Sequence, residues 1–145
     1  MKKLLFIFLS ILITFTACKK YQDGPSFTLY PKKYRLARGW VIDKVFENGV
    51  DKTTDYKNVY CNFSWYIDKL QNYILSYTAY NTLPYSEMGT WKFSNNKTHL
   101  LFSNNDVNAL PTISNDWTIY RLTVKEFWIE ATNSLGVNVE MHLTH

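Results

Sequence analysis

The chain has 145 residues, of which 17% are aromatic and 19% charged, and its formal net charge is +4. This length supports one domain of ordinary size and excludes two domains with separate cores. The 11 tyrosines and 5 tryptophans favour β-structure, because bulky rings pack well on pleated, half-buried surfaces. Cys18 and Cys61 are the only cysteines, too few for a disulfide framework.

The start of the chain has the pattern of a bacterial lipoprotein signal peptide. Lys2-Lys3 forms a basic start, residues 4–15 are apolar, and the small pair Thr16-Ala17 precedes Cys18. The apolar stretch is shorter than the roughly 20 residues that span a bilayer, which argues against a transmembrane helix. We therefore expect removal of residues 1–17 and lipidation of Cys18. A secretory peptide or an uncleaved anchor is the alternative.

The mature chain is expected to be nearly neutral. Removal of 17 residues from 145 leaves 128, and the loss of Lys2-Lys3 leaves 14 basic against 12 acidic side chains, a net charge of +2. This balance and an exported location argue against a nucleic-acid partner. Lipidation of Cys18 leaves Cys61 without an intramolecular partner.

Residues 18–38 differ from the rest of the chain and predict a basic tether. Six basic side chains accompany a single acid, Asp23, and Gly24, Pro25 and Pro31 interrupt regular structure. Beside a lipid anchor, each basic side chain near anionic headgroups contributes about 1 kcal/mol to membrane binding. The alternative is a solvated spacer that its own charges keep extended.

Residues 39–145 predict an antiparallel β-domain. Short runs with period-two alternation are separated by turn residues, and helical periodicity is nowhere convincing. Asn48-Gly49 is the strongest hairpin signal, because both residues tolerate positive φ. The last run alternates most clearly, which predicts one buried and one hydrated face. The expected strands cover residues 40–46, 60–67, 73–80, 88–94, 98–103, 114–122, 126–132 and 137–144.

These runs predict an all-β, eight-stranded antiparallel up-and-down barrel. Eight strands can close on themselves, which removes the exposed edges and leaves an interior that is filled by side chains or holds one small ligand. A sandwich is the alternative, although the chain lacks the long crossovers of Greek-key wiring. Residues 104–112 are rich in turn formers and predict a lid over the opening.

Aromatic side chains on the apolar strand faces are the candidate cavity lining: Trp40, Phe63, Trp65, Trp91, Phe93 and Phe127. These side chains either line a cavity for a lipid-like or ring-shaped ligand or fill the barrel completely. A second set, expected on the opposite faces or in loops, offers exposed rings for stacking on sugars: Tyr60, Tyr66, Tyr80 and Tyr85.

Cys61 alternates with three apolar residues, Phe63, Trp65 and Ile67. Free cysteine packs as a small hydrophobe, and the local sequence offers no base to activate it. The pattern therefore predicts a buried, unreactive thiol that faces the core.

Six short motifs lie across the mature chain: CKKYQDGP at 18–25, KYRLARGW at 33–40, NGVD at 48–51, GTW at 89–91, RLT at 121–123 and EFW at 126–128. Together they resemble the lipocalin-like lipoproteins of Bacteroidota. The resemblance implies a small up-and-down β-barrel on an envelope membrane. It supplies no catalytic residue, because this family is largely without assigned function.

The residues after Cys18 bear on the expected location. Surface-displayed lipoproteins of such bacteria often carry acids directly after the lipidated cysteine, whereas Lys19 and Lys20 follow it here. We therefore expect anchoring to the outer membrane, on the periplasmic side rather than at the cell surface.

No pattern for catalysis, cofactor binding or metal binding is visible. The glycines are too scattered for a phosphate-binding loop, and there is no G-x-S-x-G or S-x-x-K motif. His142 and His145 point to opposite faces of a continuing strand, which argues against a shared metal. Asp43, Glu126 and Glu130 read as solvated strand residues. We expect neither an enzyme nor a cofactor.

Three function classes remain open: a binding protein, a structural protein and an enzyme. We favour an envelope-anchored protein that binds a small apolar or glycan-type ligand. The main alternative is a structural or interaction lipoprotein, such as an envelope assembly part or inhibitor, with a solid core. An internal cavity favours the first class, and an external aromatic patch favours the second. The ligand and the oligomeric state do not follow from the sequence.

Overall fold

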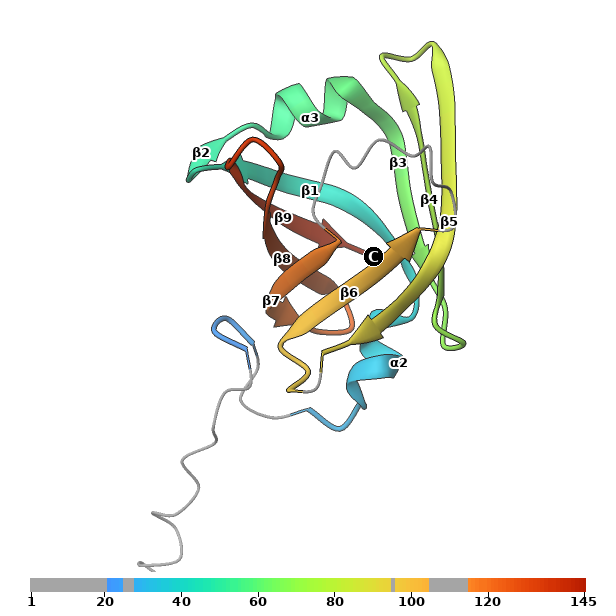
Figure 1. Cartoon of the computed structure of the whole chain (residues 1–145), viewed down its shortest axis with the longest axis vertical. Helices are drawn as coiled ribbons and strands as arrows, with labels where there is room; N and C mark the ends of the chain where they lie inside the picture. Colours follow the sequence, from blue (N-terminus) through green and yellow to red (C-terminus); the bar gives the residue numbers. More distant parts are fainter. Residues whose placement is uncertain (1–20, 25–27, 95, 105–114) are drawn as a thin grey trace, which may run out of the picture.

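The computed structural model describes residues 21–24, 28–94, 96–104 and 115–145. Two short helices and nine strands are present in these residues (Figure 1). The helices are α2 (Lys32–Leu36) and α3 (Thr53–Val59). The strands are β1 (Gly39–Glu47), β2 (Val50–Asp51), β3 (Tyr60–Ile67), β4 (Asn72–Ala79), β5 (Leu83–Phe93), β6 (His99–Asn104), β7 (Asp116–Leu122), β8 (Glu126–Thr132) and β9 (Asn138–Thr144).

The sheet closes into an eight-stranded antiparallel barrel. From β3 to β9, each strand pairs with the next along the chain, and β1 joins β9 to β3. Pairing of β1 with β9 extends from Val41 opposite Thr144 to Glu47 opposite Val139. The two-residue strand β2 only extends one edge of β1. This arrangement confirms the predicted up-and-down barrel.

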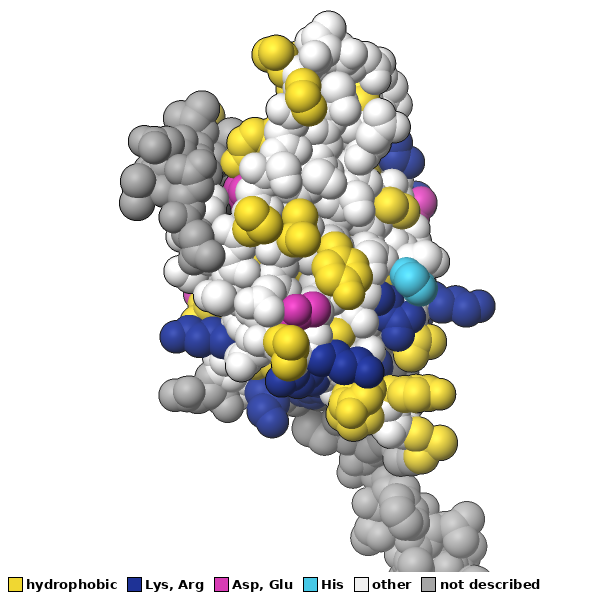
Figure 2. Space-filling model, turned by 90° about the vertical axis from the view of Figure 1, so that its right-hand side faces the viewer, with side chains coloured by type: hydrophobic (Ala, Val, Ile, Leu, Met, Phe, Trp, Pro, Cys, Tyr) yellow, Lys and Arg dark blue, Asp and Glu magenta, His cyan; other side chains and the backbone are white. Residues whose placement is uncertain are grey.

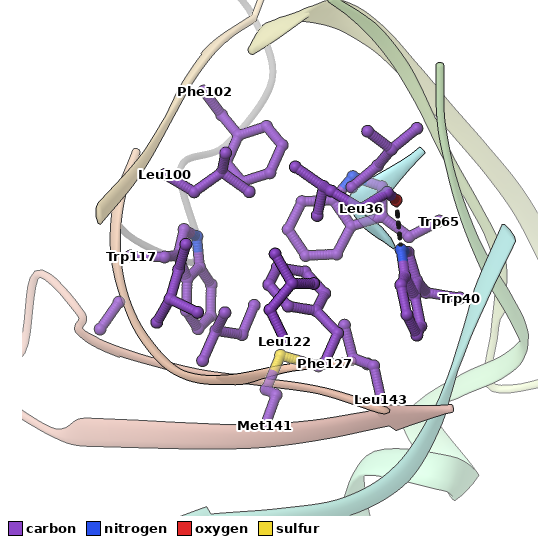
Figure 3. Close-up of a cluster of buried hydrophobic side chains, with 14 of the residues drawn as sticks. Leu36, Trp40, Trp65, Leu100, Phe102, Trp117, Leu122, Phe127, Met141 and Leu143 are labelled. Atoms are coloured by element: carbon purple, nitrogen blue, oxygen red, sulfur yellow. Dashed lines mark hydrogen bonds between the residues drawn. The ribbon is translucent and has the colours of Figure 1, made fainter. Parts of the chain in front are cut away.

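Alternation along the strands separates the core from the outer surface. In β9, Val139, Met141 and Leu143 are buried, as the period-two pattern predicts. Trp40, on β1, is fully buried and packs on Phe127 with 5.4 Å between ring centroids. Figure 3 shows such side chains converging from the barrel wall.

The Asn48-Gly49 turn has the predicted geometry. Both residues have positive φ, 48° and 80°, and Glu47 pairs with Val50 across them. The strand that follows is only two residues long, because α3 begins at Thr53. Asp51 accepts a hydrogen bond from the Thr53 backbone N–H at 2.8 Å, which supports the start of α3.

The two helices were not expected from the sequence. Helix α3 has seven residues and α2 has five, too short for a clear 3.6-residue periodicity. In Figure 1, α2 lies at one end of the barrel and α3 at the opposite end. None of the helices in the described residues is long and apolar enough to cross a lipid bilayer.

Helix α2 closes its end of the barrel and revises the expected tether. Leu36 is fully buried, and its carbonyl oxygen accepts a hydrogen bond from Trp40 Nε1 at 2.9 Å. The buried Arg35 donates to the carbonyl of Leu122, and Arg38 Nη1 donates to Val124 O at 2.5 Å. The last part of residues 18–38 is therefore packed on the barrel, because Leu36 completes the core.

Tyr21 also packs against this end. Its ring is 3% exposed, and its hydroxyl donates to Lys97 O at 3.1 Å. Burial raises the pKa of Tyr21 to about 12, and the positive charge of Arg35 acts in the opposite direction. Tyr21 and Leu36 therefore both belong to the buried core of the barrel.

A bulge in β3 places Cys61 differently from the prediction. The register with β4 shifts between Cys61 and Ser64, and Asn62 takes a φ of 54°. The extra residue brings both Tyr60 and Phe63 against the core. Cys61 is only half-buried, and its Sγ contacts the carbonyl oxygen of Asn58 at 3.1 Å. The expectation of a core-facing thiol is therefore wrong.

Strand β5 begins five residues earlier than the predicted strand at 88–94. Tyr80 and Asn81 have positive φ, 49° and 59°, which forms a tight turn into β5. Tyr85 consequently belongs to a paired strand instead of a loop and lies opposite Tyr77. Of the expected lid at 104–112, Asn104 ends β6, and the remaining residues lie outside the described part of the chain.

Candidate ligand-binding cavity

A narrow cavity opens at the α3 end of the barrel. Its volume is about 380 Å³ when the part open to solvent is included. Because part of this volume is open solvent, the cavity suits a small ligand better than a bulky one. Its lining comes from six elements: Ile42, Tyr56, Tyr60, Phe63, Leu75, Tyr77, Tyr85, Glu87 and Met141.

Four tyrosine rings form a continuous row along this cavity. The centroids of Tyr56 and Tyr60 are 5.5 Å apart, and those of Tyr60 and Tyr77 are 4.9 Å apart in an edge-to-face arrangement. Tyr77 and Tyr85 stack at 4.7 Å with 29° between their planes. Contacts of this kind hold the rings in place, so the cavity presents a preformed aromatic surface.

Glu87 is the one acid among the described residues that line the cavity. Its side chain comes from the inward face of β5, between Tyr85 and Gly89 in the alternation. It accepts hydrogen bonds from Tyr73 Oη at 3.0 Å, Tyr85 Oη at 2.8 Å and Asn104 Nδ2 at 3.2 Å. These neutral donors fix the direction of the carboxylate.

The cavity keeps its phenols in the neutral form. Burial raises the pKa of Tyr73, and the charge of Glu87 and the hydrogen bond to it raise the pKa further. Burial likewise raises the pKa of Tyr77, with smaller contributions from Tyr60 and Glu87. Tyr73 therefore stays a donor at neutral pH, and Glu87 is the acceptor that the Tyr73 and Tyr85 hydroxyls share.

A second carboxylate, that of Glu47 at the end of β1, contacts the row of tyrosine rings. Glu47 accepts a hydrogen bond from Tyr56 Oη at 2.8 Å. Burial, this hydrogen bond and the Glu47 charge raise the pKa of Tyr56, and burial followed by the charges of Tyr80 and Glu47 raises that of Tyr60. Two carboxylates, Glu47 and Glu87, therefore accept hydrogen bonds from tyrosines of this row.

Comparisons with known proteins address the fold. No protein-family model matches the chain, and no curated protein matches it. Among solved structures, the chain is similar to a lipocalin-like protein from Bacteroides uniformis, with a TM-score of 0.55 and 10% sequence identity. The match covers 76% of this chain and 97% of that chain. The protein has a lipocalin-like fold.

The lipocalin-like barrel uses the predicted aromatic set mainly as core. Trp40, Trp65, Trp91 and Phe127 are at most 6% exposed, and none of them is in the lining given above. Phe93 is half-buried beside Trp91. Only Phe63 of the six lines this cavity. The large rings pack against one another in the barrel, which leaves the cavity to the tyrosines.

The predicted exposed tyrosines separate into two groups. Tyr66 and Tyr80 are 51% and 69% exposed, as expected. Tyr60 and Tyr85 line the cavity, contrary to the prediction. The β3 bulge turns Tyr60 inward, and the early start of β5 places Tyr85 on an inward position.

Sequence analysis missed Glu87, although the sequence carried a signal for it. Tyr85, Glu87, Gly89, Trp91 and Phe93 share one strand face by period-two alternation. An acid on a face that is otherwise aromatic or glycine is unusual, because an inward charge needs hydrogen-bond partners. A strand extended back to residue 83 would have revealed it.

The histidines lie away from this cavity. His99 pairs with Asp116 at 2.9 Å, and His145 Nδ1 lies 2.9 Å from Gly39 O. His142 stacks on Trp128 with 4.1 Å between centroids. Within the described residues, no group of three or more His, Cys, Asp or Glu side chains is arranged to hold a metal ion.

Proposed function

We propose that this lipocalin-like barrel binds a small ligand in the tyrosine cavity. The observation that carries the proposal is an inward carboxylate, Glu87, beside a row of fixed tyrosine rings at an open end of the barrel. Binding sites commonly combine an apolar or aromatic wall with a few polar groups that orient the ligand. A ring or alkyl part would contact Tyr77 and Phe63, while a polar part would reach Glu87.

The test is a titration of the processed protein with small aromatic compounds, apolar dyes and aromatic sugars, followed by tyrosine and tryptophan fluorescence. We expect saturable binding of at least one class, weakened at least tenfold by Tyr77→Ala. The matched control is Tyr66→Ala, which removes an exposed ring from the same barrel. The absence of saturable binding in every class would reject the binding proposal.

We further propose that the protein is anchored to an envelope membrane through Cys18. Besides the signal-peptide pattern, the α2 end carries apolar side chains with exposed fractions from 50% to 84%: Leu29, Tyr30, Tyr34 and Leu70. Lys69 Nζ lies 4.1 Å from the Tyr34 ring centroid. Lysine and arginine side chains gather near hydrophobic ones toward the lower end of Figure 2. Such a mixture suits a membrane surface.

Cys18→Ser tests the anchor. Lipidation contributes about 0.8 kcal/mol per buried CH₂, so loss of the acyl chains should be visible directly. We expect the wild-type protein to incorporate labelled palmitate and the variant to incorporate none. Equal labelling of the two proteins would exclude Cys18 as the lipidation site.

A structural or interaction role is the second candidate. Tyr66, Ile74 and Met88 lie opposite one another across β3, β4 and β5, and all three are exposed on the outer face. A contiguous apolar row of this kind suits a protein contact. A photo-crosslinking residue at position 74 should then give one discrete product in cells, while one at the exposed position 135 should not. Identical patterns at the two positions would argue against this role.

A further inference from the structure

Among the described residues, the hydrogen-bond partners of the Glu87 carboxylate are neutral side chains. No lysine or arginine in the described part of the chain forms an ion pair with it, and its hydrogen-bond donors there are the phenols of Tyr73 and Tyr85 and the amide of Asn104. The cavity lining includes no basic side chain from the described part of the chain. The Glu87 carboxylate therefore lies at the cavity without a basic side chain from the described residues beside it.

Other features add to the attraction for a cation. Glu47 places a second carboxylate behind Tyr56. The faces of tyrosine rings attract cations through their quadrupole, and Tyr60, Tyr77 and Tyr85 form a row of such rings beside Glu87. Burial is the largest cause of the raised pKa values of Tyr60 and Tyr77, and the charges of Glu47 and Glu87, respectively, raise them further.

The Glu87 carboxylate also selects against anionic ligands and against neutral apolar ligands. An anionic ligand, such as a fatty acid, would meet Glu87 without a basic side chain to neutralise it, and like charges in a partly desolvated site repel strongly. A neutral apolar ligand would leave the carboxylate facing hydrocarbon. A monovalent ammonium compound with a flat apolar part would pair with the carboxylate, lie against the rings and fit the small cavity.

We propose that the tyrosine cavity selects small organic cations, namely ammonium compounds with a flat or thin apolar part, through the Glu87 carboxylate. This inference rests on the proposed binding function. The ammonium group would donate to the Glu87 carboxylate, and the apolar part would lie along Tyr77 and Tyr60.

The test compares three probes of similar shape that differ in charge: benzylamine, benzyl alcohol and benzoate. The processed full-length protein and its variants are titrated at pH 7 in one neutral detergent by isothermal calorimetry. We expect benzylamine to bind at least tenfold more tightly than benzyl alcohol and benzoate to show no saturable binding. Glu87→Gln should reduce the preference for the amine to within threefold.

Two further variants separate charge from folding. Glu130→Gln is the matched control, because Glu130 also accepts a tyrosine hydrogen bond, from Tyr120 at 2.8 Å, yet does not line the cavity. It should keep the tenfold preference. Tyr73→Phe removes a neutral donor but leaves the Glu87 charge, so it should keep or increase the preference. Thermal melting checks that each variant is folded.

The outcomes distinguish the two proposals. Equal binding of benzylamine and benzyl alcohol would overturn the cation inference and leave the binding function standing. If folded Glu87→Gln still preferred benzylamine, the inference would also be overturned, because a group other than the Glu87 carboxylate would then select the amine. If none of the three probes binds, and the wider set of dyes and sugars also fails, the binding function is rejected together with it.

Discussion

The Trp40 indole donates a hydrogen bond to the carbonyl oxygen of Leu36 at 2.9 Å, and both side chains are fully buried. This contact ties β1 to α2 across four residues. Because an unpaired buried indole N–H is costly, the position of α2 is coupled to the position of the first barrel strand. The closing helix is consequently part of the folded domain.

Leu36→Ala should therefore destabilise the whole barrel. Truncation of a fully buried leucine typically costs about 2 to 5 kcal/mol. Urea unfolding followed by tryptophan fluorescence measures the change. Leu29→Ala is the control, because Leu29 is 84% exposed and its truncation should cost under about 0.5 kcal/mol. Equal effects of the two substitutions would mean that α2 does not contribute to the core.

Gly89→Ala should destabilise the protein and disturb the cavity. A Cβ at this position would lie 2.2 Å from Ser103 O and 2.7 Å from Tyr73 Cε1. Overpacking of this kind typically costs about 1 to 3 kcal/mol, and a displaced Tyr73 ring would no longer donate to Glu87. Gly39→Ala is the control, because a Cβ there meets no atom within 4 Å. Thermal unfolding of both variants measures the difference, and equal melting temperatures would contradict the prediction.

Asn62→Val should destabilise the β3 bulge. Asn62 has a φ of 54°, a conformation that asparagine tolerates and a β-branched residue does not, at a cost of about 1 to 2 kcal/mol. Asn62→Gly removes the steric conflict and should be neutral or slightly stabilising. Chemical unfolding checks both values. If valine is accepted without loss, the bulge is not what holds Tyr60 in the cavity.

Stability should fall in alkaline solution. The folded protein holds several phenol protons tightly: burial raises the pKa of Tyr21 to about 12, and the hydrogen bond to Glu130, with burial, raises that of Tyr120 to about 12. In the unfolded chain these groups titrate near pH 10. Their contribution is therefore complete below about pH 10 and is lost as the pH rises toward about 12.

Denaturant unfolding at a series of pH values measures this loss. Tyr120→Phe removes one of the groups with a raised pKa, so the free energy of unfolding should fall less steeply between pH 10 and about 12 than in the wild type. An identical slope for the two proteins would show that Tyr120 does not contribute to the alkaline transition.

The barrel was predictable because its signals are local and repeated. Alternation in β9 and the Asn48-Gly49 turn each specify one strand or one turn, and eight antiparallel strands have few ways to close. The cavity was less predictable, because it depends on one extra residue at Asn62 and on where β5 begins. A shift of one residue exchanges the two faces of a strand, which explains why Tyr60 lies inward. Tyr85 lies inward because β5 extends back over residues that the sequence pattern predicts as a loop.

The closed end has a consequence for how a ligand would reach the barrel. Tyr21, the first described residue, lies beside Lys97 at the α2 end of the barrel. Tyr56 of α3, at the opposite end, borders the cavity. An anchor at Cys18 would hold the α2 end of the barrel at the membrane. The cavity at the α3 end would then open away from the bilayer. Ligand exchange would then occur with the surrounding water, and a compound dissolved in the membrane would have to leave the lipid before it could bind.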